Sequence, residues 1–585
     1  MRRCDEWSGM PSEVFLPHNN TFIPTKFDLK APLIGVKNPS NGGEPESDAA
    51  RKERERAPDL VRETAEWRFY FKQDRTFGQP RAFFTALIAS SVATADVDAL
   101  ISTKLWRLTL LDCLAGDVYD ALLSGLGFDI DVTARGLRLT CFGYDEKLGE
   151  FVALLAQAMT SFDIENPYGE GGTASEFETP QAMFERQREL LRRELEAFDT
   201  QQPYQFCKYW EASLCERPHY SREELRAALE RATLPRVASL ARSFWSGAMG
   251  KALLQGNMNS DNAAEIFTMI EKKFARSDGP TQDARDEMVS RWARLPKKEY
   301  ALVPTVAEVM DAGYVTPPAA PSLSFYPTIS HFAYDAQNAN SAVEFVWQFP
   351  ETQEPYFSKR NSTSRLSASL FPKLPSTAGG LAATAEVYAA LLEEPVFEQL
   401  RTQQQLGYIV FSGLRNVDGV RSFVVIVQSA SYGAPVLHDR VADFIAGLLR
   451  EDYRGSSTLG SLNDKDVQRV IAGLIEKKLV REKRLLQQVG RHWEEIISGT
   501  FKWDRASAEV AALRTVDLDA VLAFHNAFVS PSAPCRRVIA YHISARAGDS
   551  KPAPSANIAL IRDTDTFKKF LPSLPVRDVE VLGGY

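Results

Sequence analysis

Residues 396–413 read VFEQLRTQQQLGYIVFSG, and residues 118–132 read VYDALLSGLGFDIDV. Each stretch passes from an apolar pattern of helical period to a pattern of strand length, with glycine at the change. When a gap of two residues is allowed, Gly407 lies over Gly127, and the two glycines are 280 residues apart. The chain therefore repeats one unit, which consists of a helix, a glycine stop and a strand.

The repeat extends well beyond this unit. The turn glycines Gly136 and Gly419 lie 283 residues apart, and the same offset separates Trp210 from Trp493. Such self-similarity at a nearly constant offset is the sequence signature of a duplicated structural unit. We therefore interpret most of the chain as two copies of one domain.

Each copy continues with two runs of strand length joined by a short turn, which is typical of antiparallel neighbours. We predict an α+β fold with two homologous domains, 66–320 and 321–585, each an antiparallel-rich sheet with helices packed on one face. Residues 1–65 are expected to be the tail of a preceding domain plus a flexible linker at 38–58, a stretch rich in Pro, Gly, Ser and charge. Residues 351–380 are expected to be a surface insertion.

Composition narrows the class of protein. The net charge of −8 over 585 residues argues against a nucleic-acid binder, which would show a basic domain or stripe. No apolar run approaches the length that spans a bilayer, and the N-terminus has no apolar core of a secretory signal. The six cysteines are scattered without a C-x-x-C pair, as in proteins with reduced thiols. We predict a cytoplasmic protein with no nucleic-acid or membrane partner, and an oligomer stays open.

Arg401 and Tyr408 are the candidate site residues. In the alignment of the two copies, the first copy has Leu123 in place of Arg401 and Phe128 in place of Tyr408. The same local fold therefore requires neither a guanidinium nor a phenol. A structural alternative stays open, because a cation in a last helical turn gains about 0.3–1 kcal/mol from the helix dipole. A tyrosine at a strand start is also simply a good strand residue.

Several separated motifs resemble one known family. The stretch EEPVFEQLRTQQQLGYIVFSG is similar to the C-terminal half of the insulin-degrading or pitrilysin-like M16 zinc metallopeptidases. The motifs NNTFIPTKFDL, FYFKQDRTFGQPRA, ALLQGNMN and HWEEIISGTFKWDR resemble the same family in the same order. The family's members carry four homologous α+β domains in two bowl-shaped halves that close around a peptide. The resemblance covers the third and fourth domains, so it implies one bowl-shaped half.

The family's zinc site has the form H-x-x-E-H on a helix, with the motif glutamate activating a water. None of the seven histidines belongs to an H-x-x-E-H or H-E-x-x-H motif. The nearest approach is HWEEI, in which His492 and Glu495 are three residues apart on a predicted helix. The first copy has Tyr209 in place of His492, so the fold does not need the imidazole. We therefore expect no metal site in this chain.

The resemblance implies a chamber wall for zinc-dependent peptide hydrolysis. Zinc would be bound by a separate or missing N-terminal lobe with an H-x-x-E-H motif, and this chain alone is predicted to be inactive. By motif match, Arg401 and Tyr408 are the residues that assist catalysis or bind substrate from this half. Because the chain resembles a family half preceded by a domain tail, we expect a split subunit or a truncated product. The alternative is a catalytically inactive peptide-binding or scaffold subunit of a two-chain M16 complex.

Overall fold

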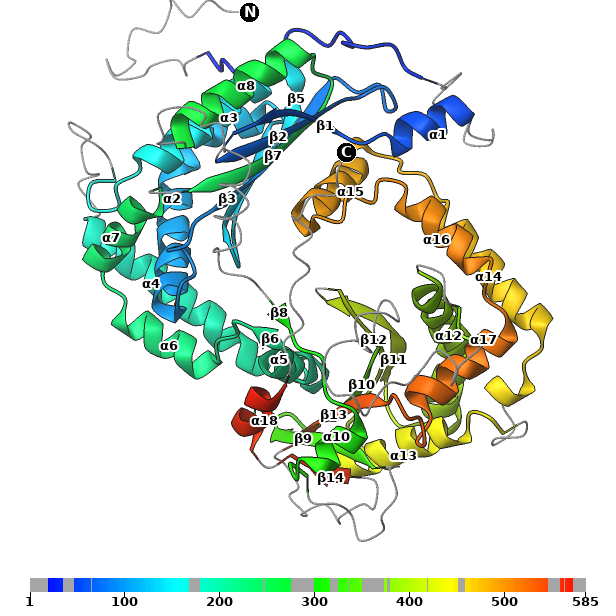
Figure 1. Cartoon of the computed structure of the whole chain (residues 1–585). Coiled ribbons are helices and arrows are strands. Elements are labelled where there is room, and N and C mark those ends of the chain that lie inside the picture. The colour runs from blue at the N-terminus through cyan, green and yellow to red at the C-terminus, as the bar shows by residue number, and fades with distance from the viewer. Residues whose placement is uncertain are drawn as a thin grey trace, which may run out of the picture.

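The computed structural model describes residues 19–34, 47–64, 66–167, 179–245, 248–274, 299–315, 325–335, 337–349, 373–375, 379–417, 419–450, 458–545, 558–561 and 563–571. The main elements form two halves, each built on one six-stranded sheet. Figure 1 shows the halves as parts of one ring of elements. Most of the expected insertion at 351–380 lies outside the described residues.

The first sheet has the strand order β1 (Asp59–Glu63), β2 (Trp67–Gln73), β7 (Met249–Gly256), β3 (Arg81–Ala89), β5 (Gly136–Tyr144) and β4 (Gly127–Thr133). Only β2 and β7 pair in parallel. One face packs against α2 (Val97–Leu123), α3 (Asp145–Ser161) and α8 (Ser260–Phe274), and around α2 lie α4 (Pro180–Ala197), α6 (Arg222–Arg231) and α7 (Leu234–Phe244). Buried aromatic side chains such as Trp67, Phe84 and Phe151 fill this core.

The second sheet has the order β11 (Ile409–Val417), β12 (Val420–Ser429), β10 (Ser341–Phe349), β13 (Arg537–Ser544), β9 (Tyr326–Phe332) and β14 (Ile558–Leu560). Here β9 pairs in parallel with β13 and β14, and the other pairs are antiparallel. One face packs against α12 (Gly380–Val396) and α13 (Ala434–Gly447), and α14 (Asp464–Lys478), α16 (Arg505–Leu513) and α17 (Leu518–Phe524) surround α12. The α+β class and the antiparallel-rich sheets confirm the predicted fold class.

Smaller elements complete the described chain. They are α1 (Asp48–Glu55), η2 (Phe198–Thr200), α5 (Pro203–Cys215), β6 (Glu216–Arg217), β8 (Glu299–Tyr300), α10 (Val306–Asp311), η4 (Phe397–Gln403), η6 (Leu459–Ser461), α15 (Leu485–Ser498), η7 (His525–Val529) and α18 (Thr564–Phe570). No helix in the described ranges is long and apolar enough to cross a membrane.

The two halves exchange one helix each, which the sequence analysis did not anticipate. Helix α5, which follows the first set of helices, packs against β10, β13 and β12 of the second sheet. Helix α15, from the second half, packs on β7 and β3 of the first sheet. Its buried Val489 and Ile496 join Tyr70, Phe83 and Leu253 in a separate core cluster. Each sheet therefore carries helices on both faces, and the second face is covered by the other half.

Part of the expected flexible linker is helical. Within 38–58, residues Asp48–Glu55 form α1, which begins at the N-cap Ser47, whose side chain accepts a hydrogen bond from the Ala50 N–H. The C-terminal end of α1 is bound by a residue of β2. The buried Lys72 ammonium donates to the carbonyls of Glu53 and Arg56, at 2.9 and 2.7 Å. Composition alone favoured disorder here, and tertiary contacts to the end of the helix override it.

Candidate functional site

Arg401 and Tyr408 lie against each other on the protein surface. The guanidinium carbon of Arg401 is 4.7 Å from the centre of the Tyr408 ring and 4.8 Å from the centre of the Phe397 ring. Tyr408 is 82% exposed and Phe397 is 45% exposed. The cation is therefore sandwiched between two open aromatic rings, an arrangement worth about 0.5–1 kcal/mol at an exposed site.

The backbone under this stack is irregular. Phe397–Gln403 form a π-helical turn that continues α12, and Arg401 lies in its last turn. The chain then leaves through Gln405, a non-glycine residue with a φ of 50°, and enters β11. Gly407 is required for a different reason, because a Cβ there would lie 1.9 Å from the carbonyl oxygen of Gln428 on β12. The glycine predicted as a helix stop thus serves close approach to β12.

The polar atoms of Arg401 and Tyr408 have no partner among the described residues. Within the described part of the chain, neither the Arg401 guanidinium nor the Tyr408 hydroxyl takes part in a hydrogen bond or an ion pair. A guanidinium carries five N–H donors and a phenol carries one O–H donor. The site can therefore donate to an oxygen of a bound molecule, and the two rings restrict the side chain that delivers the donors.

The equivalent position of the first copy is apolar and open. Leu123 is 67% exposed at the end of α2, and Tyr119 one turn earlier is 60% exposed. Phe128, which replaces Tyr408, instead turns inward and packs edge-to-face against Phe151. The same helix end and strand start therefore exist without the cationic stack.

Phe397 is the residue of this site that the sequence analysis missed. It lies four residues before Arg401, the spacing that places two side chains on one face of a helical turn. An aromatic residue at that spacing from an unpaired arginine was a usable signal.

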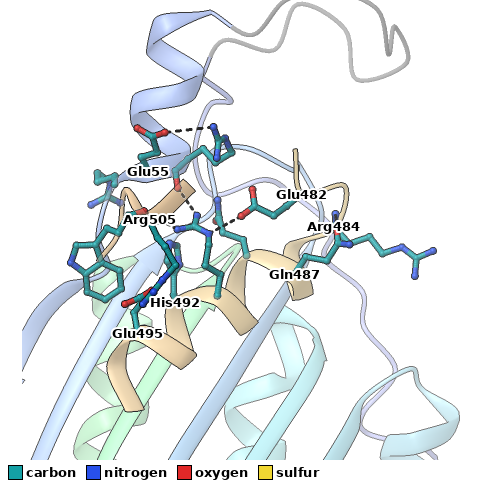
Figure 2. A network of polar contacts seen from close by, with 12 residues as sticks. Glu55, Glu482, Arg484, Gln487, His492, Glu495 and Arg505 are labelled. Carbon is teal, nitrogen blue, oxygen red and sulfur yellow. Dashed lines mark hydrogen bonds and ion pairs between the residues drawn. The ribbon is translucent and has the colours of Figure 1, made fainter. Parts of the chain in front are cut away.

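His492 and Glu495 lie in a network of polar contacts around α15 (Figure 2). His492 is fully buried, its Nδ1 lies 2.8 Å from Gln255 Oε1, and burial lowers the pKa of the imidazole to about 2. Glu495 accepts from Arg505 Nε at 2.5 Å and from the Lys502 N–H at 2.9 Å. Burial works to raise the pKa of Glu495, but these donors hold it below its usual value. The side chains join α15 to its surroundings.

The same network joins α1 to the second half. Arg491 donates to the carbonyl of Arg54 at 2.9 Å and pairs with Glu482 at 2.7 Å. Ser507 donates to Glu55 at 2.8 Å. Among the described residues, no group of three or more His, Cys, Asp or Glu side chains is arranged to hold a metal ion. The described residues therefore offer no cluster that fits the zinc of the resembled family.

Known proteins match the chain in sequence and fold. Residues 2–228 match the family described as the middle or third domain of peptidase M16, and residues 387–493 match domain 4 of the C-terminal lobe of PqqF-like PQQ synthases. The chain belongs to the M16 peptidase family. It corresponds to the middle and C-terminal domains of that family, as the sequence motifs predict.

The M16 chain is similar to curated proteins that are about twice as long. It is 26% identical to human insulin-degrading enzyme over 573 residues, which cover 94% of this chain and 47% of the relative. It is 23% identical to the peroxisomal insulin-degrading enzyme-like 1 of Arabidopsis thaliana, covering 97% of this chain and 50% of the relative. The chain spans about half the length of these curated relatives.

Solved structures share the fold. The crystal structure of pitrilysin matches with a TM-score of 0.69 and 16% identity, over 96% of this chain and 49% of pitrilysin. A protease from Helicobacter pylori matches with a TM-score of 0.52 and 10% identity, over 84% of this chain and all of that protein. At such low identity these matches speak for the fold alone.

Proposed function

We propose that the chain is the non-zinc-binding C-terminal half of an insulin-degrading-type metalloendopeptidase. It forms the wall of a substrate chamber, and peptides are hydrolysed at a zinc site carried by an N-terminal lobe with an H-x-x-E-H motif. Membership of the M16 family supports this role, and so does the match to about half of each curated relative. The proposed compartment is the cytoplasm, supported by five described cysteines that are all free thiols.

The observation that carries the proposal is the open stack of Phe397, Arg401 and Tyr408. Attack on a peptide carbonyl places negative charge on its oxygen, and a donor aimed at that oxygen stabilises the transition state. One such donor typically contributes about 2.7–4 kcal/mol to lowering the barrier. The Tyr408 hydroxyl is exposed and the Arg401 side chain is half-buried, and no group in the described part of the chain occupies the donors of either.

A second candidate is a catalytically inactive peptide-binding or scaffold subunit of a two-chain M16 complex. The same stack would then hold a carbonyl of a bound peptide without assisting its hydrolysis. The first copy shows that this fold forms with Leu123 and Phe128 at the matched positions. A pure scaffold has no need of the donor pair, so its presence favours the enzymatic role.

Reconstitution separates the two candidates. The chain is mixed with a lobe that carries an H-x-x-E-H helix, and cleavage of a fluorogenic peptide is followed with and without a metal chelator. The enzymatic role predicts cleavage that exceeds that of either part alone and stops with the chelator. Peptide binding without added cleavage in every mixture would favour the scaffold role.

A further inference from the structure

The two sheets have four outer strands, namely β1 and β4 in the first sheet and β14 and β11 in the second. An outer strand leaves a row of N–H and C=O groups unpaired, to which another chain can add. Proteins shield such edges with charges, irregular pairing or very short strands. We compared how the four edges of this protein are treated.

Three of the four edges are shielded. Strand β14 has only three residues, and β1 has charged side chains and a register shift between Leu60 and Arg62. On β4, the Arg107 Nε–H donates to the carbonyl of Ile130. Asp129 and Asp131 flank that carbonyl, and Asp131 pairs with Arg138. Charge and an occupied carbonyl thus protect β4.

Strand β11 has none of these features over most of its length. It has nine residues, and the first six, Ile409–Leu414, are uncharged. Its one charged side chain, Arg415, is engaged with the buried Glu344 and Glu211. Within the described residues, the only backbone hydrogen bonds of β11 are those to β12. In that part of the chain, the outer edge of β11 is long, regular and unpaired.

Because the domain is duplicated, β4 and β11 can be compared position by position. At the offset of 280 residues, Asp129 and Asp131 of β4 correspond to Ile409 and Phe411 of β11. Phe411 is 53% exposed. An exposed phenylalanine on an open strand edge favours association with another chain. Two shielding carboxylates in one copy are therefore apolar side chains in the other.

The exposed side chains of β11 also have a defined direction. Phe411 pairs with Ile426 on β12, and Ile426 pairs with Glu344 on β10, so the three side chains share one face. Glu344 faces α5, through its contact with Arg415 and Glu211. Figure 1 shows β11 and β12 on the inner side of the ring of elements. Strand β11 thus lies on the inner side of the ring, and it begins directly after Tyr408.

We propose that the outer edge of β11 binds an extended peptide by strand addition. N–H groups of the peptide donate to β11 carbonyls, and β11 N–H groups donate to peptide carbonyls. Apolar or aromatic side chains of the peptide lie beside Phe411, which gives a preference for alternating apolar sequences. The inference deepens the proposed function and rests on it, because it states how the chamber wall holds a peptide.

Backbone methylation tests strand addition directly. A labelled peptide of about eight residues, matched to the length of β11, alternates apolar and polar side chains. Two derivatives carry N-methyl groups at two odd or at two even positions. Only one set of N–H groups faces the strand, so one derivative should bind at least about tenfold more weakly and the other about as well as the parent. Fluorescence anisotropy with the full chain measures the affinities.

The double variant Ile409→Asp/Phe411→Asp gives β11 the charges of β4 and should abolish binding of the parent peptide. Leu190→Asp changes an equally exposed apolar residue on α4 and should have no effect. Circular dichroism establishes that both variants are folded. Equal affinity of all three peptides would overturn strand addition and leave the proposed function standing. Unchanged binding of the parent peptide by the double variant would overturn the assignment of the site to β11. Absence of parent binding would contradict both.

Discussion

At the residue scale, the fold positions Arg401 and Tyr408 without needing them. The first copy forms the same helix end with Leu123 and the same strand start with Phe128. That contrast was readable from the sequence, because duplication supplies an internal control. The π-helical turn and the positive φ of Gln405 were not readable, since a run of glutamines carries no signal for either.

Gly407 fixes how closely the loop approaches β12. In Gly407→Ala, the added methyl would lie 1.9 Å from the Gln428 carbonyl oxygen, so backbone must move. We expect a loss of about 1–3 kcal/mol in the free energy of unfolding, measured by denaturant titration. The control is Gly413→Ala on β11, where the nearest atom belongs to the exposed Phe411 ring, which can turn aside. Equal midpoints for both variants and the wild type would contradict this assignment.

His492 makes stability depend on pH. Its imidazole stays neutral in the folded protein because burial lowers its pKa to about 2, whereas in the unfolded chain it takes a proton near pH 6.5. The unfolded state therefore binds more protons than the folded state below pH 6.5. As the pH drops well below 6.5, the contribution of His492 to the free energy of unfolding falls by about 1.4 kcal/mol per pH unit.

His492→Gln should remove that contribution. Unfolding free energies of the variant and the wild type are compared at pH 6 and pH 5. The wild type should lose about 1.2 kcal/mol more than the variant over this interval. Parallel pH profiles would show that the imidazole is not held neutral in the folded state.

At the element scale, the exchange of α5 and α15 holds the halves together. The sequence predicted a helix around His492, within α15, but it predicted neither α5 nor the sheets that the two helices would cover. The reason is physical, because an apolar helix face such as that of Val489, Trp493 and Ile496 fits the exposed face of either sheet. Only the tertiary path of the chain decides between them.

Truncation in α15 tests this contact. Ile496 is fully buried against the first sheet, so Ile496→Ala should lower the free energy of unfolding by about 2–5 kcal/mol. Leu486→Ala removes an exposed side chain from the same helix and should change it by less than about 0.5 kcal/mol. Hydrogen exchange in β3 and β7 should quicken only in Ile496→Ala. Unchanged exchange there would show that α15 does not stabilise the first sheet.

At the scale of the whole molecule, the two six-stranded sheets differ at their outermost strands β4 and β11. The fold class and the duplicated plan followed from the repeat, because a constant offset reports a shared structure. The shielding of β4 and the openness of β11 followed only from the strand order, since a sequence does not say which strand is outermost. The proposed division of labour follows, in which this half holds and polarises a peptide and another lobe supplies the metal.

The most direct test of that division is Tyr408→Phe in the reconstituted mixture with a lobe that carries an H-x-x-E-H helix. The substitution removes one hydroxyl at an 82% exposed site and should leave folding unchanged. The account predicts a fall in kcat of about 10²–10³, while Tyr119→Phe, which removes the hydroxyl of an exposed tyrosine in the first copy, leaves kcat unaltered. A Tyr408→Phe mixture that turns over peptide as fast as the wild type would contradict the assigned role.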